Sequence, residues 1–325
     1  MTIAYPLRLL CLCLAAFFLV HLAVGLAVAS IAPAAIRIAD KMRPRRAAGW
    51  LLALRLLPAG LALFLVAGFC VPSYLWLEPA GTAEEVGVWF VAAVLASAAI
   101  WGISTARVGR ATIRSQRYVR NCQRVGLRTR LAGESGPVWV IDGAAPSFAL
   151  AGIVRTRMVV SREVVSALSA DQMAAALRHE RAHRISRDNL KRLFILAAPD
   201  VFPFCRAFGT LEREWARFTE WAADDRAVAG NARRSLSLAA ALVRVARLGE
   251  AARPSPLAMT FLSGNEDLSA RVERLLSGTR PRERRGRSGR IRAAGAVLAL
   301  AVVAVVLLQP ATVHSVHGLL ERLIH

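Results

Sequence analysis

Lysine, acidic residues and paired cysteines are all scarce in this chain. Among its 325 residues 22 are acidic and 43 are basic, and the only lysines are Lys41 and Lys191, so arginine carries nearly all of the formal charge of +21. The five cysteines show no paired spacing between residues 106 and 290, so nothing in that block predicts a disulfide framework. Histidine is also absent from that block except at His179 and His183. A histidine-based site there has to be built around those two residues.

Apolar sequence is what the chain has in excess, and it is gathered in blocks. Hydrophobic residues make up 55% of the chain and the mean hydropathy is +0.43, which soluble proteins rarely combine with so much basic charge. A membrane-spanning helix needs about 20 apolar residues. Four runs approach or exceed that length, at residues 9–36, 56–77, 86–104 and, somewhat shorter, 293–308. We therefore predict a mainly α, polytopic membrane protein with four transmembrane helices.

The first run and the start of the second each allow another interpretation. Residues 9–36 could be a signal peptide, but the run is about twice the usual apolar length and a basic loop follows it, which favours a retained helix. Arg55 precedes the second run, and an arginine at the bilayer centre costs about 2.5–3.5 kcal/mol on insertion scales. We expect Arg55 at the membrane interface, with the second span beginning just after it.

The arginine clusters predict the orientation of the chain. Basic residues gather in segments 37–46, 107–130 and 280–292, whereas segment 78–85 holds three glutamates and no basic residue. The positive-inside rule places the basic segments in the cytoplasm. The prediction is a multi-pass protein of the inner (cytoplasmic) membrane, with both termini outside. Its parts are a three-helix region at 1–105, a cytoplasmic domain at 106–290, and a fourth helix with a short tail at 291–325.

The same clusters bear on partners. They adjoin the predicted spans, where anionic headgroups of the lipid bilayer account for them, and no nucleic-acid recognition motif accompanies them, so we expect no direct nucleic-acid binding. Cys11 and Cys13 lie in the first run and are interpreted as apolar filler, with lipidation or metal binding as the alternatives. The oligomeric state stays open.

The motif His179-Glu180-Arg181-Ala182-His183 carries the chemistry of the chain. Two histidines four residues apart on a helix point the same way, which is the spacing that one zinc ion needs, and the intervening glutamate can reach a water on the metal. A capping-box pattern at Ser169–Gln172 predicts that this helix starts near Ala170. The motif predicts a catalytic zinc site; an inactive relative and a chance pattern are the alternatives.

Two histidines fill only two of the three protein positions of a catalytic zinc site, so a further ligand is needed. A second helix is predicted at 211–230, ending at Gly230, and within it Glu220 and Asp224 share one face. One carboxylate can bind the metal while the other holds the second nitrogen of a histidine. Glu212 and Glu214 are rival ligands, but neither has an acid four residues on.

The remaining elements are less strongly patterned. Short strands are predicted at 137–141, 147–150 and 153–161, after a basic helix that runs through about Arg128. The apolar segment 193–208 is interrupted by Asp200 and Pro203 and is interpreted as a buried or interfacial helix pair, and 278–290 as a basic linker.

Together the motifs resemble those of BlaR/MecR-type membrane metallopeptidases. The resemblance rests on segments 179–183, 187–190 and 220–226, on a late helix at 268–275, and on the arrangement of the spans. These enzymes are gluzincins with HExxH and a downstream ExxxD motif, related more distantly to HtpX-type and CAAX-processing proteases. The resemblance implies an α+β zincin-like domain and one zinc ion held by His179, His183 and Glu220, with Asp224 as a partner in the second shell.

One departure from that family is large. The β-lactam sensors continue after the fourth span into an extracellular penicillin-binding domain, whereas here only segment 311–325 follows. Direct antibiotic recognition is therefore not expected, and the input signal stays open.

The expected mechanism is hydrolysis of a peptide bond. Glu180 would take a proton from the zinc-activated water and pass it to the leaving amine. Arg226 would stabilise the oxyanion, although ion pairing with Asp188 or Asp225 explains it equally well. By analogy with the family, the sheet edge near 147–150 would bind substrate as an added strand.

We expect a membrane zinc endopeptidase that cuts a cytoplasmic protein. The resemblance suggests a BlaI-like transcriptional repressor as substrate, with self-cleavage as an activation step. The alternatives are a quality-control protease of HtpX type and a catalytically inactive membrane receptor or scaffold.

Overall fold

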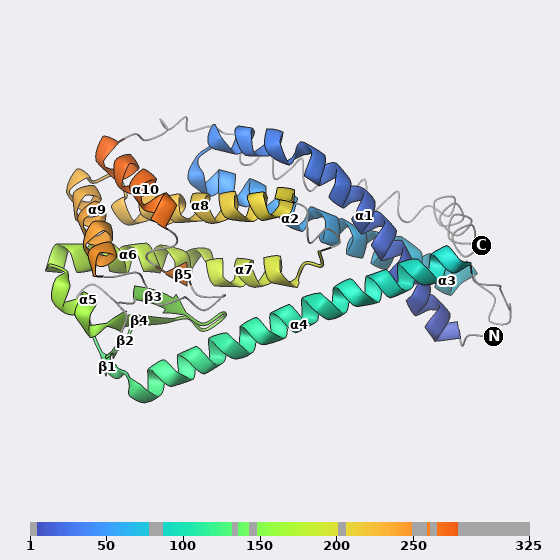
Figure 1. Cartoon of the computed structure of the whole chain (residues 1–325), viewed down its shortest axis with the longest axis horizontal. Helices are drawn as coiled ribbons and strands as arrows, with labels where there is room; N and C mark the ends of the chain where they lie inside the picture. The colour runs from blue at the N-terminus through green and yellow to red at the C-terminus, as the bar shows by residue number, and fades with distance from the viewer. Residues whose placement is uncertain are drawn as a thin grey trace.

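The computed structural model describes residues 5–77, 87–131, 136–142, 148–200, 206–248, 259–260 and 265–278. Long helices extend to one end of the molecule, and a small sheet with shorter helices occupies the other (Figure 1). The predicted mainly α architecture with a small sheet is confirmed over this part of the chain. The fourth predicted span at 293–308, the tail and nearly all of the basic linker lie outside the described residues.

Three stretches of helix are long and apolar enough to cross a membrane. They are Pro6–Asp40, Pro44–Leu77 and Val88–Val125. The first is α1 (Tyr5–Asp40), the second is α2 (Pro44–Leu65) continued by the π-helical turn η1 (Val66–Cys70) and α3 (Val71–Leu77), and the third is α4 (Val88–Val125). Each is far longer than the roughly 20 residues that a bilayer requires. They suggest a membrane-anchored protein, and α4 runs without a break across residue 105.

The helix that holds Arg55 begins well before that residue. Proline at the first helical position starts α2 at Pro44, so Arg55 lies in the middle of α2. Its side chain is only 3% exposed and pairs with Glu212 at 2.7 Å and with Asp200 at 3.3 Å. Arg107 of α4 reaches the other oxygen of Asp200 at 3.4 Å. Carboxylates of the protein therefore offset the charge that the sequence assigned to the interface.

The sheet has five strands in the order β1-β2-β4-β3-β5, with β2 and β4 parallel and the other pairs antiparallel. Its strands are β1 (Leu127–Thr129), β2 (Val138–Ile141), β3 (Phe148–Ala151), β4 (Arg157–Ser161) and β5 (Met259–Thr260). The predicted strand at 153–161 is shorter in the structure because Gly152, with φ of 97°, opens a turn before β4. Strands β1 and β5 were not predicted from the sequence. Helix α4 ends at Val125, a little before the predicted end near Arg128.

Six helices complete the domain. Two of them, α6 and α8, correspond to the helices predicted to carry the histidines and Glu220. The six are α5 (Arg162–Ala167), α6 (Ala170–Ser186), α7 (Asp188–Ala197), α8 (Arg206–Val228), α9 (Ala232–Arg247) and α10 (Asn265–Ser277). Helix α6 starts at Ala170 as predicted, and both hydrogen bonds of the capping box are present. Helix α8 starts before the predicted 211 and stops at Val228, because Ala229 and Gly230 both take positive φ angles. The predicted helix pair at 193–208 is the end of α7 and the beginning of α8.

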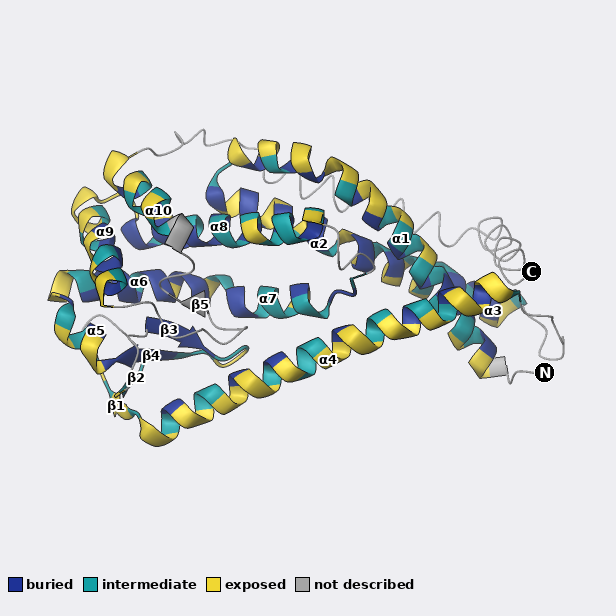
Figure 2. Cartoon of the chain, in the orientation of Figure 1, coloured by how far each residue is buried: buried dark blue, intermediate teal, exposed yellow. Residues whose placement is uncertain are grey.

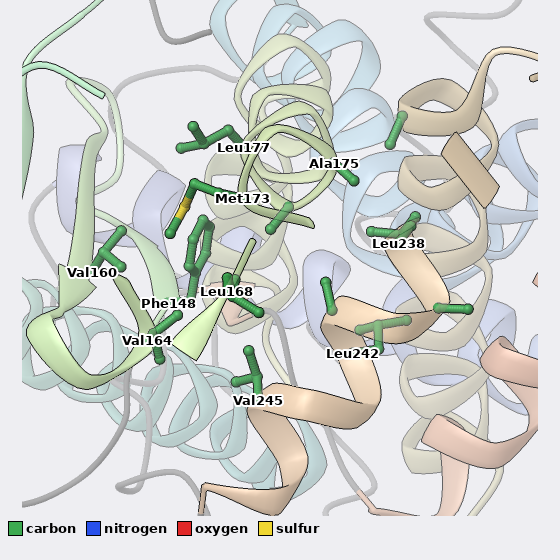
Figure 3. Packing of buried hydrophobic residues seen from close by; sticks show 14 of the residues in the cluster. Phe148, Val160, Val164, Leu168, Met173, Ala175, Leu177, Leu238, Leu242 and Val245 are labelled. Carbon is green, nitrogen blue, oxygen red and sulfur yellow. The ribbon is translucent and has the colours of Figure 1, made fainter. Parts of the chain in front are cut away.

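Two hydrophobic clusters hold the domain together. The first joins the sheet to α6 and α9, and Figure 3 shows Phe148 of the sheet beside Met173 of α6, with Leu242 on α9. The second joins α8 to the membrane-type helices, where Leu211, Trp215 and Phe218 pack against α1 and α2. Figure 2 shows that α6 and α8 are largely buried along the face that they share. Helix α8 therefore connects the long helices to the rest of the domain, together with α7 and the sheet, which pack against α4.

We expect Leu211→Ala to destabilise the protein by about 2–5 kcal/mol, because it leaves a cavity where α8 meets α1 and α2. Leu236→Ala is the matched control, since Leu236 of α9 is 58% exposed and its truncation should change the unfolding free energy by about 0.5 kcal/mol or less. Thermal unfolding in detergent measures both. Equal losses in the two variants would contradict the packing of α8 described above.

Candidate metal centre

Helix α6 presents its two histidines and the intervening glutamate to the interior. It packs against β3, α8 and α9, and His179, Glu180 and His183 are each at most 1% exposed. The histidine rings lie edge to face with centroids 4.7 Å apart. Burying three polar side chains is costly unless each finds a partner or a ligand. Each of these three side chains therefore needs a partner or a ligand on a neighbouring element.

Glu220 of α8 meets the two histidines. Its carboxylate oxygens lie 3.4 Å from His179 Nε2 and 3.5 Å from His183 Nε2, and the two Nε2 atoms are 3.0 Å apart. A tetrahedral zinc ion with ligand bonds of about 2.0–2.1 Å spaces its ligand atoms about 3.3 Å apart. The three side chains thus fit one zinc ion, and among the described residues they form the group able to hold a metal.

The rival ligands point elsewhere. Glu212 pairs with Arg55, and Glu214 pairs with Arg217 one turn further along α8. Both are engaged away from His179 and His183, whereas Glu220 converges on them. The i, i+4 pairing of Glu220 with Asp224, which singled out Glu220 in the sequence, coincides with the arrangement in space.

The second nitrogen of each histidine faces a carboxylate. Asp224 of α8 lies 2.9 Å from His179 Nδ1, and Asp188 lies 2.9 Å from His183 Nδ1. Such partners set the tautomer, so that Nε2 is left free to bind a metal. The sequence reasoning assigned Asp224 to this role but missed Asp188, which follows the left-handed Arg187 at the start of α7. In the sequence, segment 187–190 belongs to the family motif, and Asp188 is predicted only as a possible ion-pair partner of Arg226.

Arg271 of α10 is a second residue that the sequence reasoning missed. It is 2% exposed and donates two hydrogen bonds to the carboxylate of Asp224, of 2.8 and 2.9 Å. Its third guanidinium nitrogen lies 3.0 Å from the carboxylate of Glu220. Its segment, 268–275, had been recognised as a late helix but given no role. No spacing signal links Arg271 to a helix 47 residues away. Only the packing of α10 brings it to the site.

These contacts govern the charge of the carboxylates. Burial alone would raise the pKa of Asp224, but the charge of Arg271 and the hydrogen bond with His179 outweigh it and lower that pKa to about 2. Arg271 and His183 likewise hold the pKa of Glu220 well below its usual range, against the effect of burial. Burial also disfavours a charged His183, yet Glu220 and Asp188 raise the pKa of His183 to about 10. Both α8 acids are therefore anionic at neutral pH, as a cation site requires.

Glu180 differs from Glu220 in that no ion pair with an arginine is found for it among the described residues. Both of its carboxylate oxygens are buried without a hydrogen-bond partner among the described residues. Burial raises the pKa of Glu180 to about 7, against the opposing attraction of His183 and His179. A general base works best when its pKa lies near the operating pH. Glu180 is the side chain of the cluster that is suited to exchange a proton.

Arg226, the predicted oxyanion donor, contacts the far end of α6. Its guanidinium donates to Ser186 Oγ at 3.0 Å and to the carbonyl oxygen of Ala182 at 3.4 Å. The alternative ion pairs are made by other residues, since Asp188 pairs with Lys191 and Asp225 pairs with Arg274. No contact in the described structure joins Arg226 to the histidines or to Glu220. The catalytic role stays a prediction without support from these contacts.

Strand β3, the predicted substrate-binding edge, lies beside the site. Part of this strand is already paired with another strand of the chain. Asn189, next to Asp188, donates to the carbonyl oxygens of Leu150 and Gly152, which ties the end of β3 to the start of α7. Strand β3 pairs with β4 along one edge and with β5 along the other, where Leu150 lies opposite Met259. The position expected for an added strand is therefore partly taken by residues 259–260.

Converging histidines on one helix, a carboxylate from a second helix and a buried acid without a hydrogen-bond partner are the arrangement expected of a metallopeptidase. Residues 127–253 match the model of Peptidase family M48, which indicates a metallopeptidase hydrolase. The match takes in α6 and α8 with the three metal-binding candidates, and it leaves out α1–α4 and Arg271. No curated protein matches the chain.

We expect about one zinc ion per chain in detergent-purified protein, because three protein ligands converge at zinc spacing. His183→Ala should lose the metal, and Leu236→Ala should keep it, since Leu236 is exposed on α9. Elemental analysis of the purified proteins gives the ratio. A wild-type protein without zinc would contradict the assignment.

Asp188→Asn should weaken zinc binding about 10–100-fold, because it removes the carboxylate that orients His183. Asp142→Asn is the matched control: Asp142 also forms an ion pair, with Arg162, but on the protein surface. Competition with a coloured chelator measures the affinities. The role given to Asp188 fails if both variants bind zinc as the wild type does.

Proposed function

We propose that this protein is a membrane-anchored, zinc-dependent endopeptidase that cuts a cytoplasmic protein. The observation that carries the proposal is Glu180, a fully buried carboxylate without a hydrogen-bond partner beside three converging metal ligands. A structural zinc site would gain nothing from such an acid, and burying it costs free energy. Its presence supports a catalytic site over the inactive receptor or scaffold.

The residues of the site divide the work of hydrolysis. His179, His183 and Glu220 would hold the zinc ion, which supplies a water of lowered pKa and a Lewis acid for the peptide carbonyl. Glu180 would accept the proton of that water and deliver it to the leaving amine, for which its pKa of about 7 is suited. Asp188 and Asp224 keep both imidazoles oriented, and Arg271 keeps Glu220 and Asp224 anionic.

The nature of the substrate follows from the resemblance to BlaR/MecR-type enzymes and from the predicted orientation. Helices α1, α2 and α4 pack against the domain that holds the site, and the arginine clusters favour a cytoplasmic position for that domain. A soluble cytoplasmic protein could then reach the site. A BlaI-like transcriptional repressor is the substrate that the motifs suggest, and cleavage within the chain itself would be an accompanying activation step.

We expect Glu180→Gln to retain zinc but to lower kcat/KM by about 10²–10⁴-fold, because it removes the general base and leaves the ligands in place. Glu273→Gln, on the exposed side of α10, is the matched control and should be fully active. Turnover of co-expressed repressor in cells is the readout, with the Glu180→Gln protein serving as a trap for crosslinked substrate.

The outcomes distinguish a signalling protease, a quality-control protease and an inactive receptor or scaffold. Repressor captured by Glu180→Gln and purified enzyme that spares casein support the signalling protease. Broad cleavage of casein by the wild type indicates a quality-control protease. A Glu180→Gln protein as active as the wild type would overturn the enzymatic role.

A further inference from the structure

Two cysteines from different membrane-type helices meet in the structure. Cys13 lies in α1, and Cys70 is the last residue of η1. Their thiols are hydrogen-bonded to each other. Cys70 is 3% exposed and Cys13 is half-buried at the same cluster of apolar side chains. Cys11 packs against the same cluster, but it lies about 200° away from Cys13 around α1.

The register of the antiparallel hairpin formed by α1 with α2, η1 and α3 makes this meeting specific. Trp50 Nε1 donates to the carbonyl oxygen of Ala35 at 3.3 Å near the closed end of the hairpin, and Arg8 Nε donates to Tyr74 Oη at 3.0 Å near its open end. The Cys13–Cys70 contact falls between these two points in the same register. Side-chain contacts on both sides therefore hold the two thiols at one level.

The π-helical turn determines the direction of Cys70. Residues 66–70 form η1 inside an otherwise α-helical stretch. A π turn holds one more residue than an α turn, and one residue corresponds to about 100° around the helix axis. Without that extra residue Cys70 would face about 100° away from its present direction. Such turns are rare and occur often at functional sites.

We propose that Cys13 and Cys70 are a redox-active dithiol that closes to a disulfide. Closure breaks two S–H bonds and forms one S–S bond, and the two electrons and two protons pass to a quinone, which becomes the quinol. A lipid-soluble quinone is the fitting class of oxidant because the pair lies among apolar side chains, including Leu12 and Phe90. Hydrogen-bonded thiols need to approach by only about 1–2 Å to reach the S–S bond length. The inference does not depend on the proposed peptidase activity.

The disulfide would bear on the metal centre through the hairpin. Helix α1 continues unbroken from Cys13 to the segment 28–39, which packs with α2 against α8. Helix α8 carries Glu220 and Asp224. Closing the disulfide fixes one end of the hairpin whose other end holds the metal-binding helix. The oxidation state of the pair would thus be an input that reaches the site through the hairpin.

The test counts thiols in the full-length protein in membrane vesicles. Vesicles are treated with a short-chain ubiquinone, and free thiols are then labelled with polyethylene-glycol maleimide in denaturant. We expect the labelled count to fall by two from the five cysteines of the wild type, and to recover with dithiothreitol. Peptide mass mapping of the wild type should find residues 13 and 70 linked, which needs no variant.

Three variants sharpen the result. Cys13→Ser and Cys70→Ser should lose no label after quinone treatment, whereas the control Cys11→Ser should still lose two. An unchanged count in the wild type overturns the proposal, as does a loss of two that persists without Cys70. A loss that a chelator reverses without reductant would show thiols held by a metal, and this too overturns it.

Discussion

The ion pair between the buried guanidinium of Arg271 and the two acids of α8 is the interaction on which the metal centre depends. Glu220 and Asp224 lie in the interior, where an unpaired carboxylate would take up a proton rather than stay charged. Arg271 contacts both, so they remain anionic and can face the histidines. Removing one partner of such a buried pair costs about 3–5 kcal/mol, because it leaves the other charge uncompensated. The site therefore depends on α10 being packed where Arg271 can reach both acids.

Helix α8 has two functions that its two faces keep apart. One face carries Glu220 and Asp224 toward α6, and the other carries Leu211 and Trp215 toward α1 and α2. Near its start, Glu212 and Asp200 offset the buried charge of Arg55 and thereby tie α8 to α2. The metal centre is thus built on an element that the membrane-type helices position directly.

Much of the local structure follows from short-range patterns. The capping box at Ser169 and Gln172 predicted the first residue of α6, because cap hydrogen bonds depend only on neighbours in the chain. Strands β2 and β3 were found for a similar reason, as short apolar runs beside turn residues. In contrast β5 was missed, since two residues that pair with β3 carry no pattern of their own. The partners of Arg55 could not be predicted from the sequence either, because they lie 145 and 157 residues away.

The sequence by itself determined the candidate metal ligands. Spacing on a helix places His179 beside His183 and Glu220 beside Asp224, whatever the rest of the chain does, because each pair is one turn apart. Tertiary structure decided which groups surround these pairs: Asp188 on His183, Arg271 on both α8 acids, and Ser186 rather than the cluster as the partner of Arg226. The meeting of Cys13 with Cys70 was decided in the same way. Contacts between separate helices depend on how their faces pack, and no spacing within one segment encodes that.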